Sequence, residues 1–90
     1  MIEEFLNTER ITDAIARSYY EQGDGVLREF KLRVKRRVDL VTISDKGLIT
    51  IVEIKSSVAD FRSDRKWNEY IEWADQFYFG VGHNFPIDIL

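Results

Sequence analysis

The chain of 90 residues contains no cysteine, one proline and one histidine, and these shortages exclude several kinds of protein. Without cysteine there are no disulfides and no thiolate metal sites, as is common in the reducing cytoplasm. No apolar run reaches the length of a membrane-spanning helix, and the first residues lack the basic start of a secretory signal. We therefore expect a cytoplasmic protein without a membrane partner.

Positive charge is also in short supply, because 16 acidic residues outnumber 13 basic ones and leave a net charge of -3. Such a chain has no overall attraction to nucleic acid, so any DNA contact must come from a local basic patch. Hydrophobic residues make up 44% of the chain, which is typical of a folded globular protein. Ninety residues form one small domain with little stability to spare, so each buried charge needs a reason.

Two helices are predicted from apolar residues at helical spacing. The first spans residues 8–22, with Asn7 or Thr8 as its N-cap and Gly23 just after its end. The second spans residues 63–75 with Ser63 as its cap. We expect its apolar stripe to pack in the core; the stripe consists of Trp67, Tyr70, Ile71 and Ala74.

Four strands are predicted, from alternating polarity or from β-branched residues on both faces. They are residues 26–34, 37–44, 48–55 and 76–82. The order of elements is then α-β-β-β-α-β in one α/β domain. Because a helix precedes the last strand, that strand is able to pair parallel to the third.

The connection between the second and third strands sets their register. Asp45-Lys46-Gly47 is typical of a three-residue hairpin loop with glycine in the left-handed position. In that register Asp39 faces Glu53, with both side chains on the same side of the sheet. A two-residue loop would send the two carboxylates to opposite faces.

The first hairpin is less well defined. If residues 33–35 form its loop, Glu29 lies opposite Asp39, although Lys35 then stands where glycine fits more easily. The two hairpins together would place Glu29, Asp39 and Glu53 across three neighbouring strands.

Adjacent carboxylates in a sheet are costly, since two charges about 5 Å apart repel by about 3 kcal/mol at an effective dielectric near 20. One of Asp39 and Glu53 could hold a proton, Lys55 and Arg37 could compensate them, or a cation could bind between them. Oxygen ligands favour Mg²⁺ or Mn²⁺ over zinc, and the single histidine, His83, lies outside the cluster.

The pair formed by Asp39 and Glu53-Ile54-Lys55 resembles the signature of the PD-(D/E)xK nuclease superfamily. More specifically, "VEIKSSVADFRSDRKW" (52–67), with "RRVDLV" (36–41) before it and "FYFGV" (77–81) after it, closely resembles the MmcB-like DNA-repair proteins. This bacterial family is placed in that superfamily. The resemblance implies a restriction-endonuclease-like core, a mixed four-stranded sheet flanked by helices, and it covers nearly the whole chain.

The resemblance also implies roles for the motif residues. Asp39, Glu53 and the backbone carbonyl of Ile54 would hold Mg²⁺ or Mn²⁺. Lys55 would orient or activate the attacking water and steady the developing charge.

A further acidic residue is expected at such a site. In the superfamily it often comes from the first helix, where Glu9 is the best match, and in the MmcB-like pattern it comes from the first strand, where Glu29 matches. We favour Glu29 because the predicted register of the first hairpin independently places it opposite Asp39. Catalysis is thus expected to involve Asp39, Glu53, Lys55 and Glu29.

Two basic tracts are candidates for contacting DNA phosphates. Arg36 and Arg37 lie in the first hairpin, and Arg65 and Lys66 lie at the start of the predicted second helix. The alternative is that they are solvated surface charges that balance the acidic residues.

These observations predict a magnesium-dependent deoxyribonuclease that works in DNA repair beside other repair proteins. The alternative is a non-catalytic DNA-binding or protein-interaction module with a vestigial nuclease fold. A third possibility is that the carboxylates of Asp39 and Glu53 are purely structural. The family pattern continues beyond Leu90, so we expect residues 1–90 to form a single domain that lacks this C-terminal extension. Without this extension an edge of the sheet could be exposed, and it could pair with the sheet edge of a second copy to form a homodimer.

Overall fold

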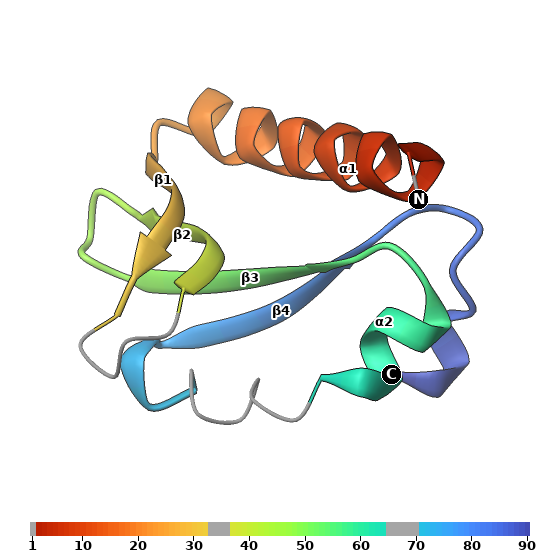
Figure 1. Ribbon diagram of the computed structural model, residues 1–90. Helices are drawn as coiled ribbons and strands as arrows, with labels where there is room; N and C mark the ends of the chain where they lie inside the picture. The colour runs from red at the N-terminus through yellow and green to blue at the C-terminus, as the bar shows by residue number, and fades with distance from the viewer. Residues whose placement is uncertain (1, 33–36, 65–70) are drawn as a thin grey trace.

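A four-stranded sheet with a long helix across one face organises the protein in the computed structural model (Figure 1). The structure describes residues 2–32, 37–64 and 71–90, with side chains from Asn7 onward in the first helix. Its elements are α1 (Ile2–Glu21), β1 (Gly25–Lys31), β2 (Arg37–Ile43), β3 (Ile49–Lys55), α2 (Val58–Ser63), the 3-10 turns η1 (Ile71–Trp73) and η2 (Ile87–Ile89), and β4 (Gln76–Val81).

The sheet has the predicted mixed topology. Its described strands lie in the order β1-β2-β3-β4; β1, β2 and β3 pair antiparallel, and β4 pairs parallel to β3. The predicted fold class is therefore confirmed. No helix within the described ranges is long and apolar enough to cross a membrane.

Helix α1 begins earlier than the sequence pattern indicates. Asn7 and Thr8 lie inside it, so the prediction that one of them caps its start is wrong. The Thr12 hydroxyl donates to the Thr8 carbonyl at 2.7 Å, a bond inside the helix that lets a buried threonine lie in its interior. The predicted end is confirmed, because Gly23 has a φ of +92° and its N–H donates to the Tyr20 carbonyl at 3.0 Å.

The second helix begins earlier than predicted and has a different cap. Ser57, not Ser63, is its N-cap: the Ser57 hydroxyl accepts the Asp60 N–H at 3.0 Å, and the helix ends at Ser63. A serine followed by an acidic residue three positions later is a capping pattern that the apolar stripe obscured. Residues 65–70, including Trp67 and Tyr70, lie outside the described residues.

The expected core stripe of this region is also partly wrong. Ile71, at the start of η1, is 46% exposed, whereas Trp73 and Ala74 pack against the core. Because η1 is a single 3-10 turn of three residues, the α-helical spacing from which the stripe was predicted does not apply here.

The hairpin between β2 and β3 has the predicted register. The Ser44 N–H donates to the Leu48 carbonyl at 3.0 Å, and Gly47 has a φ of +80°. Val41 pairs with Ile51, as expected from a three-residue loop.

The first hairpin also has the predicted register, although residues 33–36 lie outside the described part of the chain. Arg28 pairs with Leu40 and Phe30 with Val38, which places Glu29 across from Asp39. Glu29 has a φ of +53°, a left-handed conformation that is unfavourable for a residue with a Cβ atom.

Two buried clusters sandwich the sheet. Between α1 and the sheet lie Ile11, Leu40, Val52 and Ile54. The other cluster contains Leu32, Val38, Val41 and Ile51, with Trp73, Ala74 and Phe77 packed against it. Because side chains alternate along β3, Glu53 and Lys55 follow Ile51 onto the face away from α1, where α2 lies (Figure 1).

Candidate functional site

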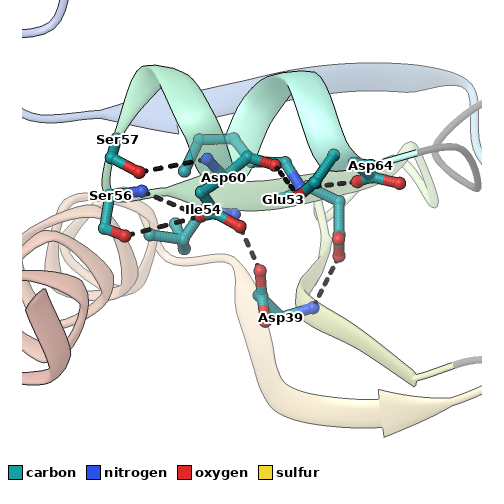
Figure 2. A network of polar contacts seen from close by, with 9 residues as sticks. Asp39, Glu53, Ile54, Ser56, Ser57, Asp60 and Asp64 are labelled. Carbon is teal, nitrogen blue, oxygen red and sulfur yellow. Dashed lines mark hydrogen bonds and ion pairs between the residues drawn. The ribbon is translucent and has the colours of Figure 1, made fainter. Parts of the chain in front are cut away.

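Asp39 and Glu53 meet where the paired part of β2 and β3 ends. The last paired residues are Leu40 and Val52, and one step beyond them each carboxylate bonds to the backbone of the opposite strand. Glu53 Oε1 accepts the Asp39 N–H at 2.9 Å, and Asp39 Oδ2 accepts the Ile54 N–H at 2.8 Å (Figure 2). The two side chains therefore hold the strands together and are fixed by them.

Lys55 lies on the same strand and the same face as Glu53, and only 5% of its surface is exposed. Its ammonium pairs with the carboxylate of Asp64, with 2.5 Å between Nζ and Oδ2. Asp64 directly follows α2. The partner of Lys55 is therefore neither Glu53 nor Asp39, which the sequence analysis considered.

The turn from β3 into α2 is closed by a second acidic side chain. Asp60 Oδ2 accepts the Ser56 N–H at 3.1 Å, while the Asp60 N–H donates to the Ser57 hydroxyl (Figure 2). These reciprocal bonds fix the start of α2 directly after the candidate motif.

A polar cavity of about 370 Å³ opens on the α1 side of Asp39. Both candidates for the additional acid, Glu9 and Glu29, line it together with Asp39 and Arg28. Arg28 pairs with Asp13 at 2.6 Å and with Glu9 at 3.6 Å. The structure thus brings both acids to one cavity, and the choice between them stays a prediction.

The carboxylate pair is electrostatically strained. Burial raises the pKa of Asp39, against the opposing effects of the Ile54 N–H and the Lys55 charge. Burial, and next the negative charge of Asp39, raise the pKa of Glu53 from its ordinary 4.5 to about 7. Near neutral pH, the pair therefore holds a proton for part of the time or needs a cation.

These residues suit a hard divalent ion in their chemistry. Within the described part of the chain, one oxygen of each carboxylate is bonded to a backbone N–H and the other accepts no hydrogen bond. Carboxylate oxygens are the preferred ligands of Mg²⁺ and Mn²⁺. No three acidic or histidine side chains among the described residues are arranged to hold a metal ion, so Asp39 and Glu53 would need water or substrate oxygens to complete the shell.

Of the four basic residues predicted to contact DNA, the structure describes one. Arg37 is exposed at the start of β2, opposite Lys31. Arg36, Arg65 and Lys66 lie outside the described residues. The role of all four in nucleic-acid binding stays a prediction.

Three residues near the site, Arg28, Asp60 and Asp64, escaped the sequence analysis. Asp60 could have been found from the Ser57-x-x-Asp60 capping pattern. The position of Asp64 depends on where α2 ends, and that of Arg28 depends on how α1 lies against β1, because Arg28 pairs with Asp13 and Glu9 of α1. Neither has a signal in the local sequence.

The family model described as "DNA repair protein MmcB-like" matches residues 5–90. The chain belongs to this family. Its motif residues Asp39, Glu53 and Lys55 all lie within the matched range. No functionally curated protein matches the chain.

A solved structure shows the same fold. It is a protein of unknown function from Silicibacter pomeroyi, 36% identical in sequence, with a TM-score of 0.88. The match covers 93% of this chain and 57% of that protein, so the chain spans a little over half of its relative's length.

Proposed function

We propose that this domain is a metal-dependent DNA nuclease acting in repair. The observation that carries the proposal is the pair of half-buried Asp39 and buried Glu53, bonded across two strands, with buried Lys55 on the strand of Glu53. Membership of a DNA-repair family supports DNA as the substrate.

The charge around Lys55 supports a role for a cation. The negative charge of Asp60 acts on Asp39, that of Asp64 acts on Glu53, and Asp39 acts on Glu53, while the Lys55 ammonium lowers the pKa of both Asp39 and Glu53. An excess of negative charge repels a DNA phosphate unless a further positive charge is present. A divalent ion supplies that charge.

Each motif residue then has a definite task. Asp39 and Glu53 would hold the ion, with the Ile54 carbonyl as a further ligand, and Glu29 or Glu9 would contribute through the cavity that they share with Asp39. When bound, the ion polarises a phosphodiester and lowers the pKa of a coordinated water. Lys55 would donate a hydrogen bond to the attacking water or to a phosphate oxygen and stabilise the developing charge.

A DNA-binding module without cleavage is the second candidate. Two observations favour it: Lys55 is already engaged by Asp64, and no three acidic or histidine side chains in the described ranges converge on one point. Such a domain would bind DNA through Arg37 and the other basic candidates.

Calorimetric titration with Mn²⁺ or Mg²⁺ separates the two. We expect binding by the unmodified protein and none by Asp39→Ala; absent binding, or equal binding by the variant, would refute the metal site. Cleavage assays on flapped, branched and single-stranded DNA come next. Metal-dependent cleavage that is lost in a folded Lys55→Ala variant supports the nuclease, whereas DNA that is bound and never cut supports the module.

A further inference from the structure

The ion pair between Lys55 and Asp64 is the most buried one among the described residues. The side chains are 7% and 10% exposed, whereas those of Arg28 and Asp13, which form an ion pair between α1 and β1, are 41% and 61% exposed. Burying two charges is costly, and replacing such a pair with apolar residues is often neutral or stabilising. Stability alone is therefore a weak reason for this pair.

The position of Asp64 is fixed from several sides. Helix α2 is held at its start by the Ser57 cap, and the Asp64 N–H donates to the Phe61 carbonyl at 3.3 Å. The ring of Phe61 packs edge-to-face against Phe79 of β4 at 5.1 Å and against Phe85 at 6.2 Å. The short helix thus presents the Asp64 carboxylate at a defined point over β3.

Lysine needs such a partner because its side chain is a flexible four-carbon chain that carries a compact charge. The Lys55 ammonium acts electrostatically on both Asp39 and Glu53, yet its ion pair in the described structure is with Asp64. Without Asp64, the carboxylates of Asp39 and Glu53, on which the ammonium already acts, remain to attract it. The ammonium would then move toward that pair and compete with a metal ion for the same oxygens.

We propose that Asp64 is a positioning residue that holds the Lys55 ammonium beside the carboxylates of Asp39 and Glu53 and so leaves their oxygens to the divalent ion. The inference rests on the proposed nuclease function. Asp64 does not touch the ion or the DNA; it acts through Lys55.

Mn²⁺ affinity measured by calorimetry tests the proposal. Asp64→Asn should weaken Mn²⁺ binding by about 10- to 100-fold, the range found for outer-shell residues of metal sites. The double variant Lys55→Met with Asp64→Asn should bind Mn²⁺ as tightly as the unmodified protein, because no ammonium is left to compete. Asp64→Glu, which keeps the charge, should recover most of the affinity. A purely structural Asp64 would not give this recovery on removal of Lys55.

Asp45→Asn is the matched control, because it removes an exposed carboxylate in the loop between β2 and β3, at the other end of these strands from Asp39 and Glu53, and it should leave Mn²⁺ affinity unchanged. Thermal unfolding shows whether each variant is folded, and Asp64→Ser replaces Asp64→Asn if the latter does not fold. Unchanged affinity in folded Asp64→Asn, or equal loss in the double variant, overturns the proposal.

A metal-free crystal structure of the Asp64→Asn variant separates this proposal from the nuclease function. If the unmodified protein binds no Mn²⁺, the nuclease proposal fails and the crystal structure alone decides the placement of Lys55. Lys55 Nζ within ion-pair distance of Asp39 or Glu53 supports the positioning role. An unmoved Nζ refutes it.

Discussion

Glu53 accepts a hydrogen bond from the backbone N–H of Asp39 at 2.9 Å, so a side chain continues the bonding between β2 and β3 past their last paired residues. Asp39 returns a bond to β3 through the N–H of Ile54. This arrangement keeps two carboxylates close together and largely out of water. Its consequences can be measured without knowing the substrate.

Replacing Glu53 with glutamine should change how stability depends on pH. Because the pKa of Glu53 is higher in the folded protein, about 7 against 4.5, its favourable contribution is complete below about pH 4.5 and is lost as pH rises through about 7. This rise in the pKa of Glu53 corresponds to a change of at most about 3 kcal/mol in the free energy of unfolding. Without metal, Glu53→Gln should therefore gain stability over the unmodified protein at high pH and show little difference at low pH.

Urea unfolding at about pH 5 and about pH 8 measures this dependence. The exposed Glu21→Gln variant is the control and should keep the pH dependence of the unmodified protein. If Glu53→Gln retains the same dependence as well, the strained carboxylate pair is not its source.

Metal binding should release protons near neutral pH. Because the pKa of Glu53 lies at about 7, an ion bound by Asp39 and Glu53 must displace a proton that is partly present there. We expect Mn²⁺ affinity to rise with pH through this range. Calorimetry in buffers of different ionisation enthalpy counts the protons released, and Glu53→Gln should release fewer. Affinity that is independent of pH would argue against Glu53 as a ligand.

Glycine in place of Glu29 should stabilise the fold and weaken the site. The φ of +53° is unfavourable for a side chain and accessible to glycine, so Glu29→Gly should raise the free energy of unfolding by up to about 1 kcal/mol. The same variant removes a carboxylate from the cavity beside Asp39, and Mn²⁺ binding should weaken if Glu29 serves the ion.

Glu29→Gln is the comparison, since it keeps a Cβ atom and removes only the charge. It should show the weaker metal binding without the gain in stability. Equal stability of the glycine and glutamine variants in chemical denaturation would mean that the left-handed backbone carries little strain.

Gly80 should not tolerate a methyl group. A Cβ atom there would lie 2.5 Å from Ile15 Cδ1 and 2.8 Å from Ile54 Cδ1, in the layer between α1 and the sheet. Both isoleucines would have to shift at once, so Gly80→Ala should cost about 1–3 kcal/mol. Gly82→Ala is the control, because its Cβ atom would be 3.5 Å from Ile11 Cδ1, an ordinary contact. Thermal unfolding of both variants should show a loss for Gly80→Ala alone.

Much of the fold could be predicted from local signals. Gly47 defines the loop between β2 and β3, and the register counted from it brings Asp39 opposite Glu53, where the structure has each carboxylate bonded to the other strand. The pairing of the first hairpin followed from the same counting and is confirmed by Arg28 opposite Leu40. The predicted cap of the second helix is wrong, because Ser57 caps α2 upstream of the apolar stripe on which the prediction depended, and residues 65–70 of the predicted span lie outside the described residues.

The sequence by itself determined the strand register and hence the meeting of Asp39 with Glu53, because both depend on residues a short loop apart. Only the tertiary structure decided the partner of Lys55 and the strained backbone of Glu29. Asp64 reaches Lys55 because Phe61 packs α2 against β4, and Glu29 joins Asp39 and Glu9 where α1 crosses β1 and β2. Such contacts form between elements distant in the chain, and their energies arise from packing and burial that no local pattern records.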